Sequence, residues 1–302
     1  MTRERRFLWE ARAVRWVGAL VRPLPRRLML MVGAALGRLL GDLDRRHLAI
    51  VRDNLQRAFP EWDEARVRRT ARGVYAHFGR VLIDILWLAG RSREQILALV
   101  DVENGHHVEA LLRENTRGCV IVTGHIGNWE ACGVAHGWLF RPMSVVARPL
   151  DNPALDAPLV AFRQRSGNPV IYKQKALSQI LRALRENREV AMLVDQNVQE
   201  KDGIFVEFFG RPAASTTVAA ALAVKTGAVL LPGHVEMTDA GRYRLTYDAP
   251  IRWTPSGDRE ADVAALTQRI ASVIEGWVRE TPEQWLWMHR RWKTQPTPTE
   301  AR

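Results

Sequence analysis

The fold is most clearly indicated by one run of residues, Gly118-Cys119-Val120-Ile121-Val122-Thr123-Gly124-His125-Ile126-Gly127-Asn128-Trp129-Glu130. Its apolar, β-branched first half predicts a buried strand that ends at Thr123-Gly124. Asn128 is a suitable cap for a following helix, which would carry Glu130 in its first turn. Ligands bind at the carboxyl ends of strands in open α/β sheets, which is where His125 is placed. We therefore predict that His125 acts as a general base and that Glu130 turns back to hold one tautomer of the imidazole.

The same spacing from a histidine to an acid occurs at His234 and Asp239. There the neighbouring residues predict a strand that runs into a hairpin turn at residues 239–241. Side chains five apart in an extended segment point to opposite faces of the sheet, so His234 is interpreted as structural. For His125 the spacing by itself is also compatible with an ordinary loop histidine.

From residue 118 onward, predicted strands and helices alternate. Residues 8–98 are almost entirely helical in pattern, with breaks at Pro23, at Pro25 and at Phe59-Pro60. This order predicts an α/β fold with a mixed, mostly parallel central sheet flanked by helices and preceded by an N-terminal helical, membrane-associating region. The expected regions are residues 1–98, an α/β core at 99–293 and a flexible tail at 294–302. Strands are expected near 119–123, 143–147, 169–172, 190–194 and 228–231, helices near 128–139, 153–166, 175–187, 215–226 and 261–280, and a hairpin between 235–237 and 243–248.

The positive charge is concentrated at the start of the chain. The formal net charge is +11, and residues 1–46 hold eleven arginines against four acids, together with Trp9 and Trp16. The apolar run at residues 28–37 is shorter than the ~20 residues that a membrane span needs. An arginine-rich, amphipathic segment with tryptophans is typical of peripheral attachment to an anionic membrane. The alternative is a pair of solvated helices packed on the core. Because no nucleic-acid-binding motif occurs, nucleic acid is not an expected partner.

The cysteines and histidines give no sign of a metal site. Cys119 and Cys132 lack CxxC spacing, and the chain shows no His-x3-His or HExxH pattern. With two cysteines and no secretory-signal pattern, a disulfide is not expected, and both thiols are interpreted as packing residues. Neither a metal nor a cofactor is predicted.

Six short blocks follow one another along the chain: Asn54–Pro60, Gly124–Glu130, Arg148–Pro153 with Asp156, Asp195 to Thr217, Pro232, and Pro282–Lys293. In this order they resemble the lipid A biosynthesis acyltransferases, the late acyltransferases of the lysophospholipid acyltransferase superfamily. The resemblance covers about residues 20 to 293 and implies the same kind of α/β core.

The resemblance implies transfer of an acyl chain from a thioester to a hydroxyl of a lipid A precursor. His125 would remove the hydroxyl proton, Glu130 would orient the ring, and the hydroxyl would attack without an acyl-enzyme. Backbone N–H groups around Gly127-Asn128 are expected to bind the oxyanion. The implied partners are acyl carrier protein, with coenzyme A as the alternative donor, a phosphorylated glycolipid acceptor and the anionic cytoplasmic face of the inner membrane.

Five further residues are predicted to bind substrate or phosphate. Arg148 is a planar cation just after a strand, and Arg163 on the next helix would extend the same surface. Asp195 again follows an apolar strand. Thr216 opens an alanine-rich helix whose N-terminus would hold a phosphate or would simply be capped. Asn152, with the nearby Asp156, would contact substrate or only cap and orient the loop that carries Arg148.

The closing block leaves two interpretations open. The spacing of Trp285, Met288 and Trp292 suits a helix face, with Trp285 packed on the core. Arg290 and Arg291 are assigned to lipid headgroups. Two other functions also stay open: a same-fold acyltransferase acting on a lysophospholipid or a glycosylated phosphoinositide, and a membrane-peripheral protein without catalysis. The closing block and the glutamate at position 130 favour lipid A.

Overall fold

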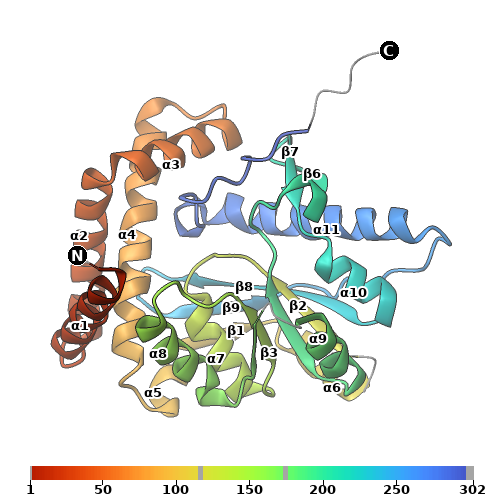
Figure 1. The fold of residues 1–302 in the computed structure, drawn as a ribbon, viewed down its shortest axis with the longest axis horizontal. Coiled ribbons are helices and arrows are strands. Elements are labelled where there is room, and N and C mark those ends of the chain that lie inside the picture. The colour runs from red at the N-terminus through yellow and green to blue at the C-terminus, as the bar shows by residue number, and fades with distance from the viewer. Residues whose placement is uncertain (1, 115–117, 173–175, 297–302) are drawn as a thin grey trace.

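A seven-stranded sheet forms the centre of the computed structural model, which describes residues 2–114, 118–172 and 176–296 (Figure 1). The strand order is β1-β9-β8-β2-β5-β3-β4, in which β8 and β9 pair antiparallel and the other neighbours pair parallel. The predicted mixed, mostly parallel sheet is therefore confirmed. The strands are β1 Val100–Glu103, β2 Cys119–Thr123, β3 Ser144–Ala147, β4 Val170–Tyr172, β5 Glu189–Leu193, β8 Val229–Met237 and β9 Tyr243–Tyr247.

Helices cover the sheet and extend beyond it. The predicted N-terminal helical region is confirmed, with breaks at Pro23 to Pro25 and at Phe59-Pro60, and the helices expected after residue 118 are also present. The described helices are α1 Arg3–Val21, α2 Arg26–Leu43, α3 Arg45–Ala58, α4 Glu64–Leu88, α5 Arg93–Leu97, α6 His106–Glu114, α7 Trp129–Leu139, α8 Pro153–Arg163, α9 Ala176–Arg185, α10 Val218–Thr226 and α11 Arg259–Glu280. Residue 175 of the expected third α/β helix and residues 297–302 of the expected tail lie outside the described residues.

Several elements differ from expectation. Strand β1 at the sheet edge, helix α6 and a separate hairpin, β6 Ile204–Phe208 with β7 Arg211–Ser215, were not predicted. Strand β7 has the sequence Arg-Pro-Ala-Ala-Ser, which contains few residues that favour strands. The closing block is not a helix: residues 285–292 follow a short 3-10 turn in an irregular path. The predicted helix face of tryptophans is therefore wrong.

Strand β2 is buried on both faces, as the apolar run predicts. Val120 and Val122 belong to one apolar core, and Cys119 and Ile121 belong to the other. Each core also includes residues of the N-terminal helices, among them Leu55 on one face of the sheet and Met29 on the other. The proposed boundary at residue 98 stays a prediction. Both cysteines are buried and unpaired, which confirms their packing role.

The N-terminal helices cross closely and carry an exposed apolar surface. Helices α2 and α4 pack closely at the glycines of α2. A Cβ atom at Gly37 would lie 2.1 Å from the carbonyl oxygen of Tyr75, so only glycine allows this approach. Large apolar side chains are exposed on α1 and α2, and these residues are together called here the apolar N-terminal face: Leu8, Trp9, Trp16, Leu20, Leu28, Met31, Leu36, Leu39, Leu40 and Leu43. Within the described ranges, no helix combines the length and apolarity that a membrane crossing requires.

Candidate active site

The candidate active site lies at the carboxyl ends of β2 and β5. These two strands pair in parallel, with Thr123 opposite Leu193, so the residues that follow them meet at one edge of the sheet. His125 follows β2 and Asp195 follows β5. The His125 Nδ1 lies 2.7 Å from Asp195 Oδ1, and the His125 backbone N–H donates to Asp195 Oδ2 at 2.7 Å. The structure thus brings together two residues that are seventy positions apart.

Asp195 is held as an acceptor and not as a ligand for phosphate. Its side chain is buried, and Trp285 Nε1 donates a third hydrogen bond to Oδ2 at 2.8 Å. Burial would raise the pKa of Asp195, but the charge of His125 and these hydrogen bonds lower it to about 2. Its negative charge would repel a phosphate, so the structure gives Asp195 the role of a partner to His125, whereas a contact between Asp195 and the substrate stays a prediction.

This arrangement fixes the tautomer of His125. A carboxylate only accepts, so the proton lies on Nδ1 and Nε2 is left as the basic atom. The side chain is 20% exposed, and Gln196 Nε2 donates a long hydrogen bond of 3.4 Å to Nε2. Burial would lower the pKa of His125, but the charge and hydrogen bond of Asp195, with a smaller effect from Glu130, raise it above 6.5. A free, basic imidazole nitrogen at a strand end has the geometry of a general base.

Glu130 does not orient the imidazole, which corrects the predicted role. It lies in the first turn of α7, where Arg163 at the end of α8 donates to both carboxylate oxygens, at 2.7 and 2.5 Å. Trp129 Nε1 donates to the same carboxylate at 3.2 Å. The parallel pairing of β2 with β5 places Asp195 beside Nδ1 of His125. Glu130 is held instead by the two hydrogen bonds that Arg163 donates to its carboxylate.

Arg163 contacts Glu130, and its predicted binding of substrate or phosphate stays a prediction. The side chain is 14% exposed, so the guanidinium is largely removed from water. Its Nη1 is buried and has no hydrogen-bond partner among the described residues. A buried, charged donor without a partner is costly unless something else accepts from it. Arg163 is therefore the described residue near Glu130 that has a spare donor for a negative group.

The described contacts of Arg148 and Asn152 are with residues other than His125, Glu130 and Asp195. The Arg148 side chain is 83% exposed and pairs with Asp151 at 3.4 Å. Asn152 caps α8 through Ala154 N and donates to the Phe7 carbonyl and to Glu10. The alternative interpretation, in which Asn152 caps the helix after the Arg148 loop, is confirmed.

Asp156 and Thr216 also have local roles. Asp156 accepts from Leu150 N and from the Tyr172 hydroxyl, which orients the loop that carries Arg148. Thr216 accepts from Val218 N at 3.4 Å just before α10, but the N-cap position of this helix is Thr217 and no side chain caps it, so the capping interpretation of Thr216 is not confirmed. It also lines a very small void beside Asp195 and Arg291, which leaves no room for a phosphate.

The closing block forms a strap behind the turn at residues 125–127. Leu286 N donates to the His125 carbonyl, and Gly127 N donates to the Gln284 carbonyl. The expected oxyanion site around Gly127-Asn128 is therefore wrong for Gly127, because its N–H is already used. Trp285 is 1% exposed and its core position is confirmed.

Arg291 lies inside the protein and not at a headgroup surface. It is 2% exposed and donates to the Ala214 carbonyl and to Ser215 Oγ, whereas Arg290 is exposed. Burial lowers the pKa of Arg291 to about 10, opposed by the nearby charge of Asp195. The headgroup prediction fails for Arg291 because the β6–β7 hairpin, which was not predicted, covers it.

His234 is structural, as predicted. It lies buried in β8 and stacks on Trp277 at 4.6 Å between ring centroids. Burial lowers its pKa to about 4, so the ring is neutral.

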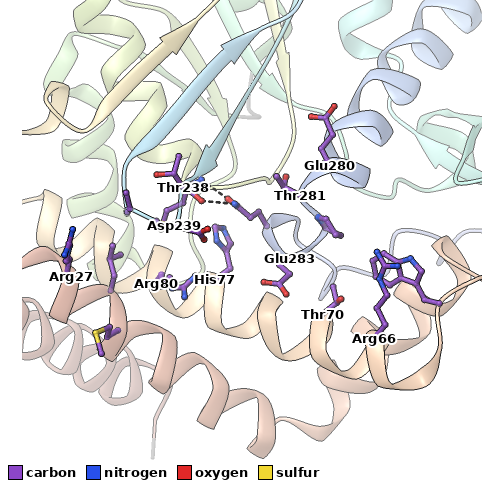
Figure 2. Close-up of a pocket in the computed structure, with 18 residues that line it drawn as sticks. Arg27, Arg66, Thr70, His77, Arg80, Thr238, Asp239, Glu280, Thr281 and Glu283 are labelled. Atoms are coloured by element: carbon purple, nitrogen blue, oxygen red, sulfur yellow. Dashed lines mark hydrogen bonds between the residues drawn. The ribbon is translucent and has the colours of Figure 1, made fainter.

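A separate cleft of about 660 Å³ lies between α2 and α4 on one side and the β8–β9 turn with the end of α11 on the other. Figure 2 shows His77 and Arg80 of α4 facing Thr238 and Asp239 of the turn across this space. Gln284 lines the cleft, whereas the next residue, Trp285, bonds to Asp195. None of the seven predicted site residues, all of which the structure describes, lines this cleft. The chemistry of the site therefore lies outside it.

The described ranges contain no group of three or more His, Cys, Asp or Glu side chains arranged to hold a metal. The residues around His125 have instead the composition of an acid–base site, with a histidine, two carboxylates and an arginine.

Comparison with known proteins connects this site to a family. Residues 2–294 match the family model described as bacterial lipid A biosynthesis acyltransferase. The chain is 29% identical to the lipid A biosynthesis lauroyltransferase of Escherichia coli (strain K12) over 292 residues, which cover 95% of this chain and 92% of the relative. It is 28% identical to a lipid A biosynthesis acyltransferase of Haemophilus influenzae over 289 residues, 93% of this chain and 88% of the relative. It is also 29% identical to a phosphatidylinositol mannoside acyltransferase of Mycolicibacterium smegmatis over 210 residues, 67% of this chain and 64% of the relative.

Proposed function

Because the chain belongs to the bacterial lipid A biosynthesis acyltransferase family and is an acyltransferase, we propose that it moves a fatty acyl chain from a thioester to a hydroxyl of a lipid A precursor. The observation that carries the chemistry is the His125–Asp195 pair, which leaves Nε2 as the free basic atom at the carboxyl end of β2.

In the proposed reaction, Nε2 of His125 takes the proton of the acceptor hydroxyl as its oxygen attacks the thioester carbonyl. The tetrahedral oxyanion then collapses and the carbon–sulfur bond breaks. The leaving thiolate receives from Nε2 the proton that the acceptor hydroxyl gave up. Asp195 stabilises the imidazolium that exists between these two steps. No acyl-enzyme forms, because the lipid hydroxyl attacks the thioester directly.

Arg163 is the proposed donor to negative charge in this reaction. Its Nη1 has no partner among the described residues, and its other donors are held by Glu130. An arginine fixed in this way loses little further side-chain entropy when it binds an oxyanion or a phosphate oxygen. Glu130 thus contributes by holding Arg163 and by its charge near His125, and not by a hydrogen bond to the imidazole.

The proposed donor is acyl carrier protein. The family resemblance favours this carrier, and the net charge of +11 would attract an acidic protein over a distance. Such attraction fades as salt rises, whereas a smaller thioester such as acyl-coenzyme A would benefit less from it. The proposed acceptor is a phosphorylated glycolipid.

The apolar N-terminal face is the proposed attachment to the cytoplasmic face of the inner membrane. It combines exposed leucines and tryptophans with the arginine excess of residues 1–46. Such a surface binds an anionic membrane through apolar burial and electrostatics together. Trp9→Ser with Trp16→Ser should weaken flotation with anionic vesicles. The matched control is Leu177→Ser, which changes an exposed apolar residue on α9. Equal flotation of all three proteins would place the attachment elsewhere.

A labelled-acyl assay tests the substrates. The purified protein is given each thioester donor in turn, with a tetra-acylated lipid A precursor, lysophosphatidic acid or a mannosylated phosphoinositide as acceptor. We expect transfer from acyl carrier protein to the lipid A precursor, at a rate that falls as salt is added. Transfer to the mannosylated phosphoinositide instead would favour the second candidate, which the similarity to phosphatidylinositol mannoside acyltransferases supports.

A further inference from the structure

Asp84 is a buried carboxylate that connects the N-terminal helices to the catalytic turn. It lies on α4 with its side chain fully buried, and Arg26, the first residue of α2, donates to it through Nη1 at 2.5 Å. The Tyr243 hydroxyl also donates to Oδ2, and Asn128 Nδ2 donates to Oδ2 at 3.1 Å. Burial raises the pKa of Asp84, and the charge of Arg26 opposes this rise. A buried carboxylate that lost these donors would lower the stability of the fold, so the position of Asp84 among them is tightly determined.

Asn128 depends on this carboxylate for the direction of its amide. It is fully buried at the start of α7, and its Oδ1 accepts from Ala131 N at 3.1 Å, which caps the helix. Capping needs the oxygen to face the helix and the NH₂ group to face away. Asp84 accepts from that NH₂ group and so favours the capping direction over the flipped one.

The cap controls the residues on either side of it. His125 lies three residues before Asn128, and Trp129 and Glu130 form the first turn of α7. The Trp129 ring stands edge-on to His125 at 5.0 Å between centroids, and Glu130 holds Arg163. If the helix frayed at Asn128, both Trp129, which contacts the imidazole of His125, and Glu130, which holds Arg163, would therefore move.

We propose that Asp84 is a positioning residue for acyl transfer, which fixes the Asn128 amide so that α7 begins correctly and holds Trp129 and Glu130 in place. The inference rests on the proposed function, because it assigns the turn at residues 125–130 to catalysis. Through Arg26, the same carboxylate also connects the turn to α2, the helix that carries much of the apolar N-terminal face.

Asp84→Asn tests the amide direction with almost no change in volume. An asparagine at position 84 turns an NH₂ group toward Asn128 in one of its two orientations, and this favours a flipped Asn128 that no longer caps α7. We expect kcat to fall about 10- to 100-fold, as for a displacement of about 1 Å at a reacting group. The KM for the thioester donor should change little, because donor binding does not need the cap.

The swap Asp84→Asn with Asn128→Asp distinguishes positioning from simple loss of stability. It restores an amide–carboxylate hydrogen bond in the reverse direction, and an aspartate also caps a helix. We expect the double variant to recover at least about 10-fold in kcat over Asp84→Asn, which is a coupling that independent sites do not show. In the background of Asn128→Ser, whose hydroxyl caps α7 and has no amide to flip, Asp84→Asn should have little further effect on kcat.

Glu189→Gln is the matched control. Glu189 is a fully buried carboxylate at the amino end of β5, opposite to the end that carries Asp195, and it pairs with His136 and Arg141. Glu189→Gln and Asp84→Asn should both lower the melting temperature, but in Glu189→Gln the kcat per folded enzyme should stay unchanged. An unchanged kcat in Asp84→Asn, or a swap that leaves kcat as low as in Asp84→Asn, would overturn the inference. A wild-type protein that transfers no acyl group would instead overturn the proposed function.

Discussion

Strand β5 has a histidine–carboxylate pair at each end, and the two pairs are built differently. Beyond its carboxyl end, Asp195 bonds to Nδ1 of His125, whose side chain is 20% exposed and whose Nε2 faces only Gln196 at 3.4 Å. At its amino end, Glu189 bonds to Nε2 of His136, whose Nδ1 is taken by the Tyr247 hydroxyl at 2.6 Å and whose side chain is 2% exposed. Both rings are oriented by a buried carboxylate.

The difference lies in what the second ring nitrogen can reach. His136 has both nitrogens in use and no access to solvent, so it can only contribute to stability. The Nε2 of His125 has only a long hydrogen bond from Gln196 among the described residues, so a ligand hydroxyl can replace this partner and give Nε2 its proton. In the proposed mechanism, a histidine–carboxylate pair is thus a base at the carboxyl end of β5 and a packing element at its amino end.

His125→Ala should have the largest effect of the changes that test this comparison. Loss of the general base is expected to lower kcat by about 10²- to 10⁴-fold. The fold and vesicle binding should be retained, although the free energy of unfolding should fall because the buried Asp195 loses its histidine partner. The measurement is the labelled-acyl assay, with circular dichroism and vesicle flotation as controls. A His125→Ala protein with normal turnover would refute the proposed mechanism.

Asp195→Asn should have the next largest effect and a distinct pH signature. The asparagine no longer stabilises the imidazolium, so kcat should fall by about 10²-fold or more. In the proposed mechanism, activity needs unprotonated His125 and so should rise with pH through the pKa of His125, which Asp195 raises from its usual value. Without that charge, burial lowers the pKa of His125, so the acidic limb of the pH–rate profile should move to lower pH. A limb that stays in place would mean that Asp195 does not act on His125.

The same pair gives stability a pH dependence. The pKa of Asp195 is lowered to about 2, so its contribution is present above its unfolded pKa and is lost as the pH falls toward 2. His125 acts in the opposite direction, because its raised pKa stabilises the fold at low pH and this contribution is lost as the pH rises through that value.

Arg163→Lys should have a smaller effect, which its matched control Arg148→Lys should lack. A lysine keeps the charge but cannot bind both oxygens of Glu130 and still present a third donor. We expect kcat to fall about 10-fold for Arg163→Lys, on the order of one lost oriented hydrogen bond. Arg148→Lys changes an exposed side chain and should leave the rate unchanged. An equal fall in kcat in the two variants would show that Arg148 also contributes to the active site.

His136→Leu and His234→Ala should have the smallest effects on turnover. The first leaves the buried Glu189 without a main partner and should lower the free energy of unfolding by about 3 kcal/mol, as for a broken buried pair. The second removes the stack on Trp277 and should also cost stability. In both variants kcat per folded enzyme should stay within about twofold of the wild type, since neither ring touches the reacting groups. Chemical denaturation and active-enzyme rates measure the two quantities separately. A large fall in kcat for His136→Leu would remove the distinction between the two pairs.

Local pattern was sufficient to predict the main features of the chain. The apolar run at residues 119–123 predicted a buried strand, the asparagine at 128 predicted the start of a helix, and the alternation that follows predicted an α/β sheet. These features depend on residues close together in the chain, where backbone geometry and side-chain periodicity act directly. The same reasoning placed His125 at a strand end and identified His234 as structural.

Side-chain partners were set by contacts between distant residues. The histidine at 125 bonds to an aspartate seventy residues away because β2 and β5 are neighbours in register, and no spacing in the sequence specifies that pairing. Glu130 belongs to Arg163 because the ends of two helices meet, and Arg291 is buried because a hairpin far from it in the chain covers it. The residues carried the chemical groups, but the choice of partner for each group came from strand order and helix packing, which sequence periodicity does not encode.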